Sequence, residues 1–247
     1  MPASERVLSL FARTPRLGRV KTRLTPRFTP EEALAMHQAL LQDSLDLLQR
    51  AAEAAGATAV LYLDEIVTGG PEAPAGCELR PQAGADLGER LQRAFAETLS
   101  SGADRMVVIG SDSPHLPVAS ILRAFAELDR HDLVIGPARD GGYTLLGARR
   151  VHPILFRDIP WGTAQVYRET VRRARREGLG IASLPALDDV DVEESVLRLL
   201  HELARRKAAG ERELPEKTLA LLLEWERSGR VSRRGAREAG GGASLES

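Results

Sequence analysis

The sequence predicts a three-layer α/β domain built around a mainly parallel, mixed β-sheet. Short apolar runs of β-type composition alternate with amphipathic helical patterns along most of the 247 residues. Such alternation is typical of a sheet that carries helices on both faces. The run from Met106 to Ile109 is apolar at every position, as expected of a parallel strand that is buried on both faces.

The expected strands share a short run of aliphatic, aromatic or β-branched residues between turn-forming residues. They are residues 7–12, 58–63, 77–81, 106–109, 133–135, 143–147 and 181–187. Glycine and proline are frequent between residues 65 and 75, which predicts a surface loop.

The expected helices are marked by capping residues and apolar faces. Thr29 is the expected N-cap of the first helix, with Pro30 at its first position and Glu32 three residues after the cap. Asp86 and Glu89 repeat this capping pattern at the second helix. The remaining helices are expected over residues 118–128, from a cap at Thr163 to a stop before Gly178, over 193–206 and over 215–227.

The domain organisation is expected to be simple. We find no internal repeat and no linker, so residues 1–227 are predicted to form one domain whose C-terminal helices begin near residue 193. Residues 228–247 are rich in glycine, arginine and serine and lack periodicity. Segments of this kind rarely bury a core, so we predict a disordered tail.

Composition points to an ordinary globular protein. Hydrophobic residues make up 43% and charged residues 28% of the chain, and the net charge is −1. This balance is that of an ordinary globular protein and does not indicate a nucleic-acid or membrane partner. With one cysteine, Cys77, no internal disulfide is possible, and no signal peptide is apparent at the N-terminus. We therefore expect a cytoplasmic protein, while nothing indicates its oligomeric state.

A basic loop follows the first expected strand. Its cations are Arg13, Arg16, Arg19, Lys21, Arg23 and Arg27, with Gly18 shaping the turn. Arginine forks and lysine charges suit phosphate oxygens, and free backbone N–H groups of a glycine loop add to the positive field. The glycine pattern is not that of a Walker loop. The loop is interpreted as a phosphate site, the alternative being a solvated basic turn.

Carboxylates follow two later strands. Asp112 lies three residues after Ile109, the end of the apolar run, and could ligate a hard divalent ion such as Mg²⁺, although a turn or capping aspartate explains it as well. The run Asp188-Asp-Val-Asp191 places three carboxylates before a helix. Asp191 is either a capping residue or a second metal ligand that pairs with Asp112.

Three glycine-containing loops complete the candidate site. Gly84, Asp86 and Gly88 lie at a helix start that could approach a planar base or an anion. In residues 136–143, Asp140 is the best-placed residue to contact an acceptor hydroxyl, with a possible role as a base. A turn joining two strands and a buried loop tryptophan are the alternatives for the other residues of the expected acceptor pocket, which are Gly141, Gly142, Tyr143, Trp161, Gly162 and Thr163.

Together these motifs resemble a known family. Residues 11–24, Phe-Ala-Arg-Thr-Pro-Arg-Leu-Gly-Arg-Val-Lys-Thr-Arg-Leu, are similar to the opening motif of a bacterial family of proposed GT-A glycosyltransferases associated with radical-SAM clusters or arsenosugar biosynthesis. The motifs at residues 84–90, 109–114, 136–143, 160–163 and 189–191 follow in the same order, so the resemblance spans residues 6–200. Phospholactate and molybdenum-cofactor guanylyltransferases are more distantly similar.

The resemblance implies a nucleotide-diphospho-sugar transferase (GT-A) fold. In that fold the loop after the first strand holds the nucleotide phosphates, an aspartate at the position of Asp112 binds the metal, and a late acidic residue, here Asp191, assists. The chain departs from the family at residues 189–194, Asp-Val-Asp-Val-Glu-Glu, where relatives commonly have Asp-x-Asp-Thr-Pro-Glu, and at Ser113, often a cysteine. Residues 111–113 supply one carboxylate, so dependence on Mg²⁺ or Mn²⁺ is a hypothesis.

Three functions follow from these observations. The first is glycosyl transfer from a nucleotide-diphospho-sugar to a small-molecule acceptor, in which Arg13, Lys21 and Arg23 neutralise the leaving diphosphate. The second is nucleotidyl transfer from a nucleoside triphosphate to a phosphorylated acceptor. The third is a non-catalytic nucleotide-binding module, which the retained carboxylates make less favoured.

Overall fold

The computed structural model describes residues 5–232, and their contacts divide into two compact units. Unit 1 comprises residues up to Pro15 together with Ser44–Asp189, and unit 2 comprises Arg16–Asp43 together with the chain from Val190 onward. The prediction of one domain over residues 1–227 therefore stays a prediction, and each unit is described by itself.

Unit 1 is built on a seven-stranded sheet in the order β3-β2-β1-β4-β6-β5-β7. The strands are β1 (Arg6–Ala12), β2 (Ala57–Leu63), β3 (Glu78–Pro81), β4 (Arg105–Gly110), β5 (Leu133–Pro137), β6 (Tyr143–Ala148) and β7 (Ile181–Ser183). Only β6 runs antiparallel to its neighbours β4 and β5 among these strands. The predicted mixed, mainly parallel sheet is confirmed.

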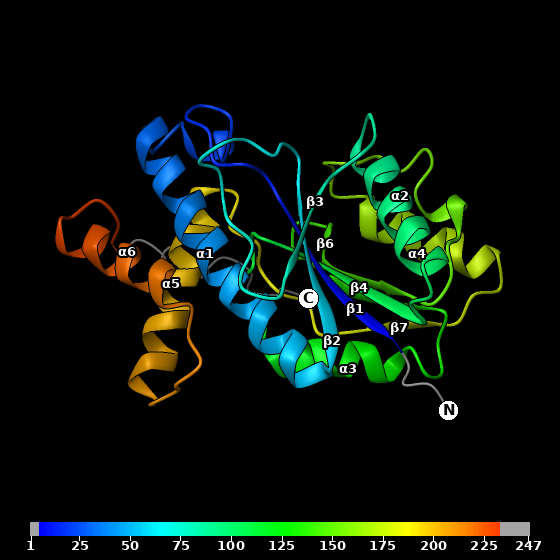
Figure 1. Ribbon diagram of the computed structural model, residues 1–247. Coiled ribbons are helices and arrows are strands. Elements are labelled where there is room, and N and C mark those ends of the chain that lie inside the picture. The colour runs from blue at the N-terminus through cyan, green and yellow to red at the C-terminus, as the bar shows by residue number, and fades with distance from the viewer. Residues whose placement is uncertain (1–4, 233–247) are drawn as a thin grey trace, which may run out of the picture. The chain divides into compact units, whose positions relative to one another are not determined.

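Helices cover both faces of this sheet. One face packs against α2 (Leu87–Ser100) and α4 (Val166–Arg176), with α3 (Val118–Glu127) on the other (Figure 1). Alternate residues of β1 enter opposite faces, because Val7 and Phe11 join the cluster under α2 whereas Leu8 and Leu10 are fully buried outside it. Burial on both faces explains the continuous apolar runs of the central strands, and the three-layer prediction is confirmed.

The helices α2 and α4 begin differently. At α2 the predicted cap is present, because Asp86 Oδ1 accepts from Glu89 N at 2.8 Å. Glu89 Oε2 accepts from Ala85 N at 3.1 Å, one residue before the N-cap, so the second half of a capping box is displaced by one residue. At α4 the predicted cap at Thr163 is wrong, since the helix begins at Val166 after a turn. The Thr163 hydroxyl instead donates to the carbonyl of Pro160 at 2.8 Å, which ties the residue to the preceding turn.

Unit 2 is helical in the residues that the structure describes. It contains a short 3₁₀ turn η1 (Thr22–Leu24), the first half of α1 (Pro30–Ala55), α5 (Glu193–Ala208) and α6 (Glu216–Arg227). Leu24, Phe28 and Met36 pack in one cluster with apolar residues of α5 and α6. The remaining short element, η2 (Pro153–Leu155), belongs to unit 1.

A buried carboxylate fixes α6 within unit 2. Asp43 is 4% exposed and accepts from the backbone N–H groups of Lys217 at 3.0 Å and Thr218 at 2.7 Å. These groups belong to the first turn of α6, where helix N–H groups have no partner within the helix. A charge on an otherwise apolar helix face is thereby satisfied.

Residues 228–232 of the predicted tail are described, and Val231 is buried at 5% exposure; residues 233–247 lie outside the described residues. Within residues 5–232, no helix combines the length and apolar character that crossing a membrane requires.

Candidate functional site

The carboxyl ends of β1 and β4 bring two predicted residues to the same edge of the unit 1 sheet. The two strands are parallel, and Phe11 pairs with Gly110 at the end of the register. Arg13 and Asp112 each follow that pair by two residues. Arg13 is exposed and Asp112 is half-buried. In open α/β sheets ligands bind at this edge, so a cation and a carboxylate share the expected location of a ligand.

The late acidic motif also reaches this edge, through Asp188. Its backbone carbonyl accepts from the Ser113 hydroxyl at 3.0 Å, and its carboxylate lies 3.4 Å from Arg139 Nε. The Asp188 side chain is 16% exposed, compared with 66% for Arg139. Our sequence reasoning favoured Asp191 in this motif and missed the structural role of Asp188, although both belong to the same run of carboxylates.

The turn between β5 and β6 holds Asp140 in a defined position. Asp140 is exposed, and its Oδ1 accepts from Gly142 N at 2.8 Å. The carbonyl of Gly141 accepts from Tyr167 N at 2.8 Å. A Cβ on Gly141, which has a φ of 93°, would lie 2.2 Å from the carbonyl oxygen of Ala164. The turn is therefore packed directly against the start of α4, and only glycine fits there.

Three predicted loops meet at Trp161. A Cβ on Gly88 would lie 2.4 Å from Trp161 Nε1, so the indole packs on the first turn of α2. The rings of Trp161 and Tyr143 meet edge to face at 6.0 Å between centroids. The structure thus brings together residues that were predicted separately as nucleotide-binding and acceptor-binding.

Tyr143 is unusual among these residues. Its hydroxyl oxygen is buried and has no hydrogen-bond partner among the described residues, and burial raises the pKa of its phenol above the ordinary value of 10.0. The hydroxyl therefore stays protonated. Gly162 and Thr163, the other residues of the expected pocket, are exposed in the turn before α4.

The loop before α2 is held by two residues that sequence reasoning missed. Gln82 Nε2 donates to the carbonyls of Ala12 at 2.9 Å and Tyr62 at 3.1 Å, at the ends of β1 and β2. Arg90 Nε donates to the carbonyl of Gly84 at 3.1 Å. A Cβ on Gly84 would lie 2.7 Å from Arg90 N. Asp86 serves as the helix cap, as the capping pattern had indicated.

In unit 2, the cations of the basic loop contact acceptors of the same unit. Lys21 is 8% exposed, adopts a left-handed conformation with a φ of 50°, and donates from Nζ to the carbonyl of Val190. Arg23 Nη1 lies 2.8 Å from Asp191 Oδ2. Arg27 Nε donates to Glu193 at 3.0 Å. Gly18 is exposed with a φ of 70°.

Asp191 precedes α5 but does not cap it with its carboxylate. The Ser195 hydroxyl accepts from the backbone N–H groups of Asp191 at 2.9 Å and Val192 at 3.1 Å. This leaves the Asp191 carboxylate for Arg23. The predicted phosphate ligand and the predicted metal ligand therefore form an ion pair, in which Arg23 is 60% and Asp191 30% exposed.

The metal prediction is not decided by these contacts. Among residues 5–232, no group of three or more histidine, cysteine, aspartate or glutamate side chains is arranged to hold a metal ion. Asp112 belongs to unit 1 and Asp191 to unit 2. Their pairing stays a prediction.

Comparisons with known proteins support the fold. Residues 45–163 match the family described as an uncharacterized protein conserved in bacteria (DUF2064). A protein of Desulfovibrio desulfuricans G20, solved as a proposed nucleotide-diphospho-sugar transferase, is 32% identical, with a TM-score of 0.80 over 94% of this chain and 98% of the other. No curated protein matches the chain.

More distant structures share the fold alone. A nucleotidyl transferase from Methanothermobacter thermautotrophicus is 15% identical, with a TM-score of 0.52 over 82% of this chain and 99% of its own. A CMP:2-keto-3-deoxy-manno-octonic acid synthetase complexed with CTP is 14% identical, with a TM-score of 0.50 over 85% of this chain and 100% of its own. With 32% identity along nearly the whole of both chains, the protein belongs to the family of the Desulfovibrio protein, carries the DUF2064 region and has the nucleotide-diphospho-sugar transferase fold.

Proposed function

We propose that the protein is a transferase that moves a sugar from a nucleotide-diphospho-sugar to the hydroxyl of a small acceptor. The observation that carries the proposal is the shared register of β1 and β4, after which Arg13 and Asp112 follow at the same sheet edge. The likeness to a proposed nucleotide-diphospho-sugar transferase supports a nucleotide diphosphate, among anions, as the ligand.

The basic loop supplies the charge that the reaction needs. When the glycosidic bond to the diphosphate breaks, negative charge builds on the leaving phosphate, and prearranged cations stabilise it. We assign this role to Arg13, Lys21 and Arg23. Gly18 in the same loop, and the loop of Gly84, Asp86 and Gly88, are assigned to binding the nucleotide.

Carboxylates of the chain suit a divalent ion as a cofactor. Asp112 is half-buried next to Ser113, whose hydroxyl is held by the carbonyl of Asp188 at 3.0 Å. Mg²⁺ usually takes one or two carboxylates and completes its shell with phosphate oxygens and water, so this donor set fits Mg²⁺ or Mn²⁺. We propose Asp112 as a ligand and Asp191 as a second. A bound ion would add positive charge at the leaving diphosphate.

The acceptor is assigned to the turn of Asp140. The hydrogen bond from Gly142 N orients the exposed Asp140 carboxylate, which can take the proton from an attacking hydroxyl that lies within hydrogen-bond reach. We propose that the acceptor pocket consists of Gly141, Gly142, Tyr143, Trp161, Gly162 and Thr163. An indole and a phenol that meet edge to face provide the apolar surface for a sugar or another ring.

A thermal-shift screen tests this function. The panel contains ADP-, CDP-, GDP- and UDP-sugars and the nucleoside triphosphates, each with and without Mg²⁺ or Mn²⁺. We expect one nucleotide-diphospho-sugar to raise the melting temperature, since ligand at 100 times its Kd stabilises a protein by about 2.7 kcal/mol. R23A and D112A should lose the shift, whereas R206A, altered on α5 where Arg206 pairs with Glu211 at 2.7 Å, should keep it.

The products then separate the candidate reactions. Glycosyl transfer releases a nucleoside diphosphate, whereas nucleotidyl transfer from a triphosphate releases pyrophosphate. Tight binding without turnover across acceptors indicates a non-catalytic module. The proposal is contradicted if no nucleotide-sugar changes the melting temperature of the wild type. It is also contradicted if R23A and D112A both show wild-type kinetics.

A further inference from the structure

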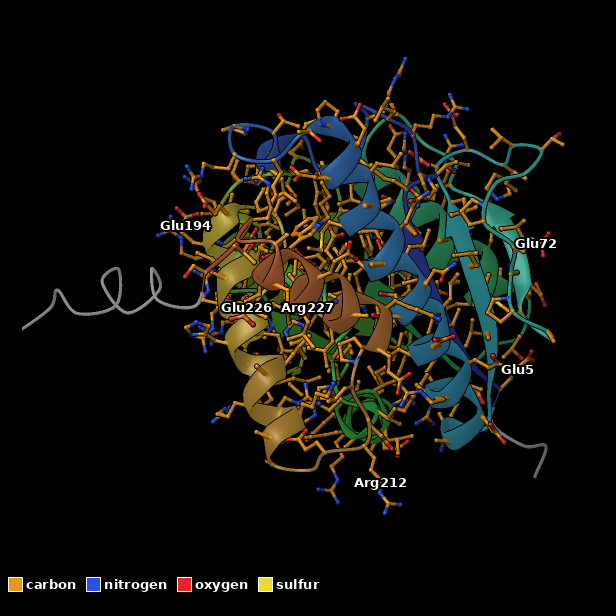
Figure 2. The ribbon with its side chains drawn as sticks, turned by 90° about the vertical axis from the view of Figure 1, so that its left-hand side faces the viewer. Glu5, Glu72, Glu194, Arg212, Glu226 and Arg227 are labelled. Carbon is orange, nitrogen blue, oxygen red and sulfur yellow. The ribbon has the colours of Figure 1, made fainter. Side chains whose placement is uncertain are left out.

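The chain does not leave unit 2 where α6 ends. Gly229 adopts a φ of 75°, Arg230 N donates to the carbonyl of Trp225 at 2.8 Å, and Gly229 N donates to that of Glu226 at 3.1 Å. This is the Schellman arrangement that reverses a chain after a helix. Figure 2 labels Glu226 and Arg227 at the end of the helix, just before this reversal. Val231 then returns into the core at 5% exposure.

The reversal brings Arg230 to the segment that follows the basic loop. Arg230 Nε lies 2.6 Å from Glu32 Oε1 and Arg230 Nη2 lies 2.8 Å from Glu32 Oε2, so the guanidinium forms a bidentate pair with the carboxylate. Nη2 also donates to the carbonyl of Arg27. The guanidinium carbon lies 4.7 Å from the centre of the Phe28 ring, in cation–π contact.

Each of these contacts reinforces a local feature of residues 27–32. Glu32 accepts from Thr29 N at 2.7 Å, and Glu32 N donates to Thr29 Oγ1 at 3.2 Å, which completes the capping box of α1. Phe28 stacks on Trp225 with 5.0 Å between ring centroids. Arg230 therefore links Arg27, Phe28 and the first turn of α1.

We propose that Arg230 is a positioning residue for the basic segment, residues 16–27. The proposal rests on the proposed function, in which Lys21 and Arg23 of this segment bind nucleotide phosphates. A loop that is already ordered loses less conformational freedom when its ligand binds, and affinity rises accordingly. By holding Arg27 and Phe28, Arg230 anchors the C-terminal end of the segment.

Arg206 provides a matched control within unit 2. It is likewise partly buried, pairs with Glu211 at 2.7 Å and Glu202 at 3.5 Å, and donates to the carbonyl of Glu213 at 3.1 Å. These contacts join α5 to the loop before α6 and do not involve the basic segment. R206A thus removes a similar set of interactions from the same unit.

The test measures order in the segment and anion binding separately. The full chain, R230A, R206A and E32Q are treated briefly with trypsin, and mass spectrometry measures cleavage after Arg16, Arg19, Lys21 and Arg23. Calorimetry measures the Kd for inorganic pyrophosphate without divalent metal. E32Q keeps a side chain that can cap α1, so it serves if R230A does not fold.

We expect R230A and E32Q to be cleaved faster in the segment than R206A, and R230A to bind pyrophosphate about five- to twentyfold more weakly, as loss of an ion pair, a carbonyl contact and a cation–π contact implies. Cleavage and Kd in R230A and E32Q that match R206A overturn the proposal. Faster cleavage in a protein whose wild type binds no pyrophosphate supports the positioning role and rejects the phosphate function.

Discussion

The turn at residues 138–142 of unit 1 and the basic segment, residues 16–27 of unit 2, are held in different ways. The turn is held by backbone hydrogen bonds and close packing, because Gly141 accepts from Tyr167 N at 2.8 Å and lies against Ala164. In the basic segment Leu24 is buried, but the exposed arginines are held by side-chain charges, with Arg23 2.8 Å from Asp191 and Arg27 3.0 Å from Glu193.

This difference suggests different tasks for the two regions. Overpacking a close-packed region costs about 1–3 kcal/mol, and such rigidity suits groups that must hold a reacting hydroxyl in one orientation. Exposed ion pairs contribute about 0–1 kcal/mol each, so their arginines can exchange a carboxylate for a phosphate at little cost. We infer that the turn at residues 138–142, the proposed acceptor side, is rigid and that the basic segment, the proposed phosphate side, exchanges partners when a ligand binds.

The largest expected effect comes from filling the close contact in unit 1. In G141A the new Cβ lies 2.2 Å from the Ala164 oxygen at a φ of 93°, and overpacking together with the left-handed backbone predicts a loss of about 3 kcal/mol. G178A is the control, because Gly178 has a φ of 70° with nothing within 4 Å. Its expected loss is about 1 kcal/mol. Urea unfolding of both variants measures the difference.

Equal losses in the two variants would show that the 138–142 turn is free to move away from α4. This result would contradict the inference that the 138–142 turn is rigid.

A smaller effect is expected from the ion pair of Arg230 in unit 2. The Arg230 guanidinium lowers the pKa of the Glu32 carboxyl below its ordinary value of 4.5. The stabilisation is therefore present above pH 4.5 and is lost as the pH falls through the lowered pKa of the folded state. We expect E32Q to be less stable than the wild type by about 0.5–1 kcal/mol at neutral pH.

Urea unfolding of the wild type and E32Q across the acid range measures this pH dependence. The difference between the two proteins should shrink as the pH is lowered. A difference that stays constant with pH would mean that Glu32 acts through packing and helix capping instead of charge.

Local patterns predicted most of the elements of the fold. The apolar runs marked the sheet strands, and the capping residue Asp86 marked the start of α2, since each signal lies within a few residues of the element that it marks. The cap at Thr163 failed because the turn at residues 160–163, which packs Trp161 on α2, delays the helix to Val166. Contacts with distant residues, invisible to a local pattern, decided that boundary.

The candidate site was predicted at the level of its motifs but not of its contacts. Residues at strand ends could be expected to lie at one sheet edge, as Arg13 and Asp112 do after the paired strands β1 and β4. The contact of Arg230 with Glu32 joins residues 198 positions apart, and a pattern of residue spacing cannot predict a contact over that separation. The partner of Arg23, Asp191, is 168 positions away, so its carboxylate could be recognised as a candidate ligand but not as a counter-ion.

The most direct test of the exchange at the phosphate side is a calorimetric titration of pyrophosphate into the wild type, R23A and D191N. Without divalent metal, R23A should lose at least about tenfold in affinity, since a hydrogen bond to a charged group is lost. D191N should bind about threefold more tightly, because Arg23 is released from its competing carboxylate. With Mg²⁺ added, the wild type and R23A, which both keep Asp191, should gain further affinity, whereas D191N should not if Asp191 is a metal ligand. Unchanged affinity in R23A, or weaker metal-free binding in D191N, would contradict the account.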